Sequence, residues 1–523
     1  MKRLGIGYEN YKRILDDGCY YMDKTLLIRD IVQKGGMVTL FTRPRRFGKT
    51  LALSMIRTFF ELEYDRDGNV VDNSRYFDGM KIMGAGDDIL SLMGQYPVIN
   101  LSLKSAKQPR FFDAFWKLRE EIIREIGRHE YLAVSDRLQA SQKSAFQGLL
   151  DVIIKRNNLV ELLDEETEEG LLKKEMPLFS TAIRILSECL RQHHGRNVII
   201  LIDEYDMPLE NAYFAGFYDE MVGFIRSLFE SALKTNDALE RAVITGCLRI
   251  SKESIFAGLN NLEICSIRST NFGEYFGFTQ DETEEMLAHY DLADKVEEVR
   301  EWYDGYLFGE AEVYNPWSVI KYVSEHVASH DRFPEPYWAN TSSNAIIKDL
   351  VYQADEDRKK ELDGLIAGRT IEKRIHEDIT YDDVYVDEDN LWNFLFFTGY
   401  MKKVSERKQE EDIYVTMEIP NAEVRSIYRN QIVSWFEGIK KEADRSVLFR
   451  AIVGRDGDAI GDFMSELLEK TISTFDSGES FYHGFFISLL SGMPRYAVRS
   501  NREEGIGRPD AVLYPNRPKD PAY

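Results

Sequence analysis

Five short runs of β-branched and aliphatic residues in the first half of the chain limit its fold more than any other feature of the sequence. Amphipathic patterns with a helical period separate most of these runs. Strands that alternate with helices predict an α/β fold with a doubly wound parallel sheet and right-handed crossovers. The predicted strands are 37–42, 97–103, 198–203, 241–246 and 262–267, and the predicted helices are 51–63, 111–126, 178–192 and 217–233.

The first predicted strand leads into a loop with the residues of a phosphate cradle, ending in Gly48-Lys49-Thr50. Backbone N–H groups of such a loop, together with the N-terminus of the next helix, attract an anion. Lys49 can reach the β and γ phosphates of a nucleotide, and the Thr50 hydroxyl can ligate Mg²⁺. The usual pattern opens with glycine, and Arg43 stands there instead. The predicted nucleotide-binding residues are Arg43, Pro44, Arg45, Arg46, Phe47, Gly48, Lys49, Thr50 and Leu51.

The third predicted strand, 198–203, has the composition of a strand that is buried on both faces, and it ends in Asp203-Glu204. Ligands of open α/β sheets bind at the carboxyl ends of the strands. We therefore predict that Asp203 holds the Mg²⁺ shell and that Glu204 orients and deprotonates an attacking water. The alternative is an acidic, solvated strand end. In combination with the loop, ATP hydrolysis is the favoured interpretation.

The strand 241–246 should lie between the loop strand and the acidic strand. Thr245 near its end would then touch the γ-phosphate or the attacking water, and Arg249 would act as a γ-phosphate or subunit-bridging arginine. The alternative is that Thr245 is an ordinary strand-end residue and Arg249 a surface cation. The sequence leaves open whether Arg249 serves its own nucleotide or that of a neighbouring chain.

Composition limits the class of protein. The chain has 523 residues, 44% hydrophobic and 30% charged, which is typical of a globular protein with two to four domains. Its net charge of −23 argues against a surface that coats nucleic acid, although a local basic groove stays possible. No apolar stretch approaches the ~20 residues that span a bilayer. We expect a cytoplasmic protein without membrane contact.

From about residue 279 the sequence becomes richer in helical patterns and aromatic residues. Thr279 followed by Asp281 and Glu282 predicts a capped helix start. Aromatic residues around Trp302–Tyr306 and Tyr314–Trp317 predict a packed helical subdomain. The expected domains are a P-loop ATPase-like domain at 1–278, a helical lid or winged-type subdomain at 279–350, a mostly helical linking region at 351–430 and an incomplete α/β domain at 431–523.

Several segments together resemble the AAA-ATPase-like family of bacteria and archaea, and they cover nearly the whole chain in order. They are 21–25, 43–50, 201–206, 245–246, 256–261, 276–279, 302–306 and 314–318. The resemblance implies that an arginine at position 43 is ordinary in this family. It also implies a C-terminal domain similar to the PD-(D/E)XK nuclease superfamily, but it supplies no substrate.

The resemblance implies that Glu479 and Asp510 correspond to two metal-binding carboxylates of the nuclease-like domain. Such a domain next needs a strand ending in Glu-x-Lys, and the sequence stops at Tyr523, where that strand should begin. We therefore expect a vestigial metal site without nuclease activity. The expected cause is truncation of a longer reading frame; the alternative is a domain with a nonenzymatic role.

Two functions compete for this chain. The first is an ATP- and Mg²⁺-dependent ATPase that, in the intact form, drives a nuclease-like effector acting on nucleic acid. The alternative is an ATP-dependent module that oligomerises or senses a partner with little turnover. The acidic charge mildly favours a protein partner over DNA, and a homo-oligomer is compatible with both. A small-molecule kinase is a weaker third option, because no acceptor site is visible.

Overall fold

The structure is a computed structural model. It describes residues 1–65, 67–154, 165–248, 255–256, 259–338, 356–376, 388–430, 445–471, 490, 496–500 and 511–515. The chain divides into two compact units. Unit 1 consists of Met1–Trp338 and Glu372–Asn421, and unit 2 consists of Ala339–Ile371 and Ala422–Tyr523.

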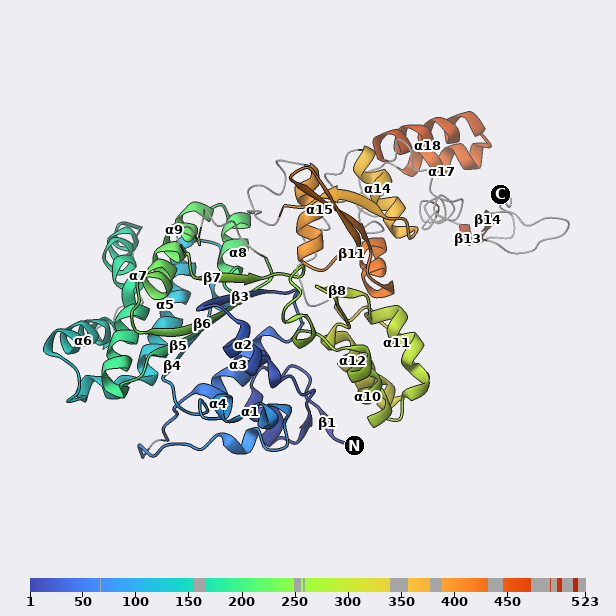
Figure 1. Cartoon of the computed structure of the whole chain (residues 1–523). Coiled ribbons are helices and arrows are strands. Elements are labelled where there is room, and N and C mark those ends of the chain that lie inside the picture. The colour runs from blue at the N-terminus through green and yellow to red at the C-terminus, as the bar shows by residue number, and fades with distance from the viewer. Residues whose placement is uncertain are drawn as a thin grey trace. The chain divides into compact units, whose positions relative to one another are not determined.

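A five-stranded parallel sheet forms the centre of unit 1, with strand order β4-β5-β6-β3-β7 (Figure 1). All five predicted strands are present, and the strand expected between the loop strand and the acidic strand is there as β6. Because β3, β5 and β6 are neighbours and parallel, their carboxyl ends meet at one edge of the sheet. The strands are β3 Val38–Thr42, β4 Val98–Ser102, β5 Val198–Asp203, β6 Leu239–Gly246 and β7 Leu262–Cys265.

Helices cover both faces of this sheet, as predicted for a doubly wound sheet. Figure 1 shows α2 and α3 on one side and α8 and α9 on the other. The helix α7 runs through Pro177, so the predicted helix 178–192 is the second half of a longer one. The bounds are α2 Leu26–Lys34, α3 Lys49–Phe60, α5 Phe111–Arg128, α6 Ala140–Ile154, α7 Glu165–His194, α8 Met207–Ala215 and α9 Tyr218–Phe229.

A short N-terminal segment precedes these elements. Its strands β1 and β2 pair in parallel, and Tyr11 from α1 is fully buried. A short helix, α4, lies between α3 and β4. The bounds are β1 Arg3–Leu4, α1 Tyr11–Asp16, β2 Cys19–Tyr20 and α4 Asp87–Leu90.

The segment after the sheet is a small helical region with a hairpin. Thr279 caps α10 in a capping box with Glu282, as the sequence predicts, and Asn315 caps α12. The hairpin β8–β9 has no counterpart in the predicted elements. The bounds are α10 Gln280–His289, α11 Val296–Tyr303, β8 Tyr306–Phe308, β9 Ala311–Val313 and α12 Pro316–Ala328.

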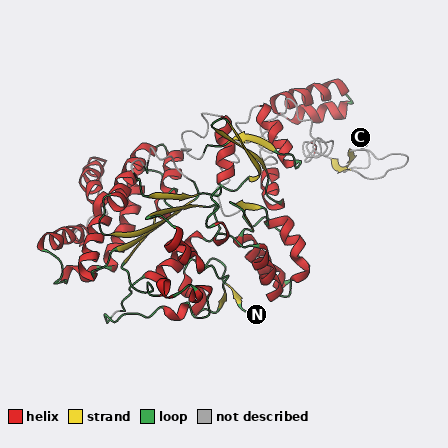
Figure 2. Ribbon diagram, viewed as in Figure 1, coloured by secondary structure: helices red, strands yellow, loops and turns green. Residues whose placement is uncertain are grey.

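The remaining elements are both helices and strands (Figure 2). The region 351–430, predicted to be mostly helical, contains helices and also a three-stranded sheet of order β10-β12-β11. Strands β13 and β14 pair antiparallel. The bounds are α14 Glu356–Ile366, β10 Ile371–Arg374, α15 Glu388–Phe397, β11 Lys402–Gln409, β12 Asp412–Glu418, α17 Arg445–Gly454, α18 Gly457–Thr471, β13 Tyr496–Ser500 and β14 Ala511–Pro515.

Within the described residues, no helix has both the length and the apolar character needed to cross a membrane.

Candidate functional site

The loop between β3 and α3 has an unusual backbone. Arg46 and Gly48 have φ angles of 70° and 79°, in the left-handed region that glycine adopts without strain. Gly48 is the N-cap of α3, so the helix begins at Lys49. The first backbone N–H groups of a helix have no partner within it. An anion at this loop would therefore be stabilised by these groups and by the helix dipole.

Lys49 is only 5% exposed, and its ammonium group is held at the loop. Nζ donates to the carbonyl oxygens of Arg43 at 2.8 Å and Pro44 at 2.9 Å, and the Sγ atom of Cys247 lies 3.6 Å away. Carbonyl oxygens are neutral acceptors, and a charged phosphate oxygen is a stronger partner for an ammonium group. The contacts therefore hold the cation next to the place where a phosphate would bind.

Asp203 links two hydroxyl groups at the carboxyl edge of the sheet. Its Oδ2 accepts from Thr50 Oγ1 at 2.7 Å, and its Oδ1 accepts from Thr245 Oγ1 at 2.6 Å. Asp203 is 4% exposed. The three residues come from β5, α3 and β6, and the strand order brings them together. Carboxylate and hydroxyl oxygens are the donor set that Mg²⁺ prefers, so these residues fit that cation.

Glu204 follows β5 in a strained conformation, with a φ of 52°. Burial raises the pKa of its carboxyl, and the charge of Asp203 raises it further, while Lys49 and Lys104 act in the opposite direction. A carboxyl group with a raised pKa is better suited to accept a proton than an ordinary surface glutamate.

Arg43, the first residue of the loop, is completely buried beneath it. Its Nη1 donates to Thr42 O at 2.9 Å and Cys265 O at 2.7 Å, at the ends of β3 and β7. The guanidinium lies 5.3 Å from the ring centre of Phe276 and 5.1 Å from that of Phe308. Burial lowers the pKa of Arg43 to about 10. The residue in place of the usual glycine is thus part of the packed interior.

The tip of the loop is seated in aromatic residues from later in the chain. Phe47 is buried, with its ring centre 4.9 Å from that of Tyr306 and 5.1 Å from that of Phe308. The Arg46 guanidinium lies 4.5 Å from the centre of the Trp317 ring. A Cβ atom on Gly399 would lie 2.7 Å from Pro44 Cγ, so the two residues are in close contact. The loop therefore has little room to move as a whole.

Two charged contacts at the site are not part of the sequence prediction. Arg45 forms an ion pair with Glu210 of α8. Lys104, just after β4, pairs with Glu9 at 2.6 Å. Burial lowers the pKa of Lys104, but the Glu9 contact and the charges of Glu204 and Asp203 raise it overall. The sequence does hold a signal for Lys104: it is a cation just after β4, and β4 pairs with the acidic strand β5.

The described residues do not include every predicted site residue. Arg249, Glu479 and Asp510 lie outside the described residues. Tyr21 and Lys24, which precede the loop in the sequence, make contacts within the protein: Tyr21 Oη donates to Met55 Sδ at 3.2 Å, and Lys24 pairs with Glu282 at 2.5 Å.

Residues 5–256 match a protein-family model described as a predicted AAA-ATPase. The matched residues include the loop, the acidic strand β5 and the strand β6. The N-terminal part of the chain is therefore similar to predicted AAA-ATPases.

Two individual proteins are also similar. An uncharacterized protein in the vnfD 5' region of Azotobacter chroococcum mcd 1 is 26% identical over 356 residues, which are 67% of this chain and 56% of that protein. The matched region thus spans little more than half of that relative. A Walker-type ATPase of Pyrococcus abyssi aligns over 78% of this chain and 94% of its own, with 14% identity and a TM-score of 0.36. The order and direction of the strands, and not this overlap, define the fold.

Proposed function

We propose that the protein binds ATP with Mg²⁺ at the loop 43–50 and hydrolyses it. The observation that carries the proposal is the bridge from Thr50 through Asp203 to Thr245, next to the Lys49 ammonium group. The match of residues 5–256 to a predicted AAA-ATPase supports the same function.

Each residue of this constellation has a role in the proposal. The loop N–H groups and Lys49 bind and orient the phosphates. Thr50 and Asp203 hold Mg²⁺, which supplies positive charge against the phosphate oxygens. Glu204 accepts a proton from the attacking water and orients it, and Thr245 fixes the Asp203 carboxylate. Arg43 keeps the loop in shape from the interior.

The test is steady-state phosphate release by purified protein with ATP and Mg²⁺. We expect Lys49→Ala and Glu204→Gln each to lower turnover by about 10²-fold or more, because both groups act mainly in the transition state. Glu204→Gln should still bind a fluorescent ATP analogue, since Glu204 does not hold the phosphates. Lys174→Ala and Glu301→Gln change exposed residues of the same types and are the matched controls. Unchanged turnover in both site variants would reject the proposal.

The finer proposal of an effector rests on the sequence resemblance. It assigns Glu479 and Asp510 to a vestigial metal site in a nuclease-like domain. We expect no metal-dependent cleavage of single- or double-stranded DNA by this chain. Robust cleavage that disappears in Asp510→Ala would contradict that expectation. The alternative, an oligomerising sensor, predicts that ATP shifts the oligomeric state while phosphate release stays at background.

A further inference from the structure

The two residues after Glu204 are buried and bind the segment that leaves β6. Tyr205 is 0% exposed and Asp206 is 2% exposed. Asp206 Oδ2 accepts from the backbone N–H groups of Cys247 at 2.7 Å and Leu248 at 2.9 Å. The Tyr205 hydroxyl donates to Leu248 O at 2.6 Å. Two consecutive side chains therefore hold the backbone of two consecutive residues, Cys247 and Leu248.

The contact continues toward the sheet. The backbone N–H of Tyr205 donates to Thr245 O at 3.1 Å. A Cβ atom on Gly246 would lie 2.5 Å from Tyr205 Cε1 and 2.8 Å from Asp206 Oδ1. The segment 245–248 thus lies directly against Tyr205 and Asp206 along its whole length.

The side chain of Asp206 does not cap the helix that it precedes. It is the N-cap residue of α8, where an aspartate ordinarily accepts N–H groups of its own helix, yet its side chain makes no capping hydrogen bond. Instead, one carboxylate oxygen binds the segment after β6. The other, Oδ1, has no hydrogen-bond partner in the part of the chain that the structure describes. Burying a carboxylate costs free energy unless hydrogen bonds compensate it. Here the backbone N–H groups of Cys247 and Leu248 supply such hydrogen bonds.

The segment that Asp206 holds contacts both halves of the proposed ATP site. At its start, Thr245 donates to Asp203 at 2.6 Å. Beyond Gly246, Cys247 Sγ lies 3.6 Å from Lys49 Nζ. We propose that Asp206 is a positioning residue: by fixing the segment 245–248 it keeps Thr245 on Asp203 and Cys247 against Lys49. This inference rests on the proposed ATPase function for its effect on turnover, and on the contacts alone for its effect on the segment.

The first test compares kcat and KM of the full chain with Asp206→Ala and Asp206→Asn. We expect Asp206→Ala to lower kcat by about 10²-fold with KM changed less than about threefold, because displaced catalytic groups lose rate more than binding. Asp206→Asn keeps an acceptor oxygen without the charge, so its kcat should lie between that of the wild type and that of Asp206→Ala. The control is Asp30→Ala, a buried carboxylate of α2 bound by Tyr275, Lys34 and Arg29. Equal loss of kcat in Asp30→Ala would overturn the proposal.

The second test follows the segment itself through its thiol. All four cysteines, Cys19, Cys189, Cys247 and Cys265, are buried and unpaired with each other. In Asp206→Ala, labelling by iodoacetamide, read by peptide mass spectrometry, should accelerate at least about tenfold at Cys247 and stay unchanged at the other three. Acceleration at all four would show general loosening, and no acceleration at Cys247 would show that the carboxylate holds nothing; either overturns the proposal. This test decides even if the wild-type chain hydrolyses no ATP.

Discussion

At the end of β6, Gly246 occupies a position that admits no side chain. The nearest atoms to an added methyl group would belong to Tyr205 and Asp206, at 2.5 Å and 2.8 Å. Both neighbours are buried and bonded, so neither can swing away. This glycine is required for close approach and not for a special φ angle.

We therefore expect Gly246→Ala to lower the free energy of unfolding by about 1–3 kcal/mol, the usual cost of overpacking. Urea denaturation followed by circular dichroism measures it. The matched control is Gly127→Ala, on the exposed side of α5 with no atom within 4 Å of the added methyl group. Alanine there should raise the free energy of unfolding by about 0.5–1 kcal/mol, because it favours the helix. A neutral Gly246→Ala would contradict the packing described for the segment.

The residues of the site that the sequence could predict are those with a local signature. Gly48-Lys49-Thr50 and Asp203-Glu204 each stand at a junction between a strand and the next element, so their types and positions carry the information. Thr245 follows once the strand order is known. Arg43 between Phe276 and Phe308, and Asp206 on the segment after β6, depend on contacts between residues far apart in the sequence. No local pattern predicts those contacts.

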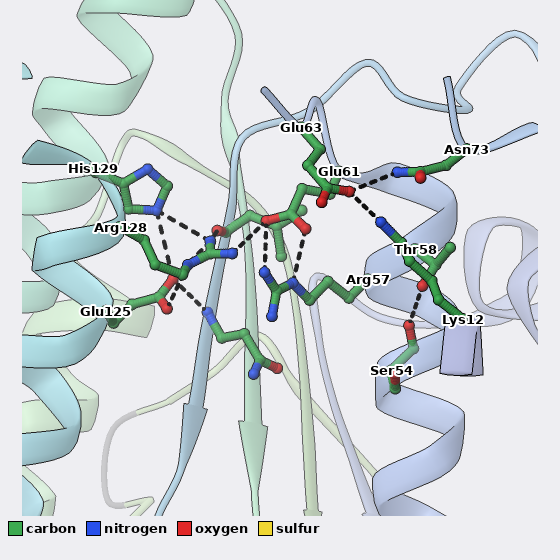
Figure 3. Close-up of polar contacts among 12 residues, drawn as sticks. Lys12, Ser54, Arg57, Thr58, Glu61, Glu63, Asn73, Glu125, Arg128 and His129 are labelled. Atoms are coloured by element: carbon green, nitrogen blue, oxygen red, sulfur yellow. Dashed lines mark hydrogen bonds and ion pairs between the residues drawn. The ribbon is translucent and has the colours of Figure 1, made fainter. Parts of the chain in front are cut away.

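At the scale of elements, a polar network lies between α3, α5 and β4, the outermost strand on one side of the sheet (Figure 3). Glu61 lies between Arg57 and Arg128, with ion-pair distances of 2.8 Å to each. Glu125 accepts from the backbone N–H of Asn100 in the edge strand β4 at 2.9 Å, and Arg128 Nη2 donates to Val98 O at 3.0 Å. The network therefore satisfies backbone groups of an edge strand that would otherwise be free to pair with another chain.

His129 belongs to this network as a neutral side chain. Its Nε2 lies 3.5 Å from Glu125 Oε1, but burial and the charge of Arg57 lower the pKa of His129 from 6.5 to about 4. Burial acts in the opposite sense on the carboxyls and raises the pKa of Glu61 and of Glu125 to about 7. Their contribution to stability is lost as the pH rises through about 7.

The contribution of His129 to stability depends on pH in the opposite direction. Its folded pKa lies below the unfolded value, so its contribution is complete above pH 6.5 and is lost as the pH falls through about 4. The difference corresponds to about 3 kcal/mol. We expect the free energy of unfolding of His129→Gln to fall less than that of the wild type between pH 7 and pH 4.5. Urea midpoints at several pH values measure it, with the exposed His330→Gln as control. Parallel profiles of wild type and His129→Gln would refute this assignment.

Two elements show where local patterns are insufficient. Pro177 suggests a helix boundary, but α7 continues through it from Glu165 to His194. Its packing against α5, α6 and α9 outweighs the lost hydrogen bond. The hairpin β11–β12 has no counterpart among the predicted strands, because β11 is mostly exposed and rich in lysine, arginine and glutamate. Such a strand lacks the apolar alternation on which strand prediction depends.

At the scale of the whole molecule, Gly399 connects a distant segment to the loop. It has a φ of 89°, and a Cβ atom there would lie 2.7 Å from Pro44 Cγ. The carbonyl of Pro44 is an acceptor for Lys49. A side chain at position 399 would therefore displace the loop.

We expect Gly399→Ala to weaken binding of a fluorescent ATP analogue several-fold, measured by equilibrium titration. Gly368→Ala separates collision from backbone strain, since Gly368 has a φ of 85° with no atom within 4 Å of the added methyl group. Equal affinities of the two variants for nucleotide would show that contact with Pro44 does not matter for the loop.

The contacts of the loop with residues later in the chain determine which fragments of the protein can be produced in folded form. Tyr306, Phe308 and Gly399 all come after residue 256, where the family match ends, and after Cys265, where the last of the five strands of the sheet ends. A fragment that ends at residue 278 would contain all five strands of this sheet and both acidic residues, but Phe47 would lose its contacts with Tyr306 and Phe308 and become exposed to water. We expect such a fragment to aggregate, and the shortest soluble fragment with an intact loop to extend to Asn421, where unit 1 ends.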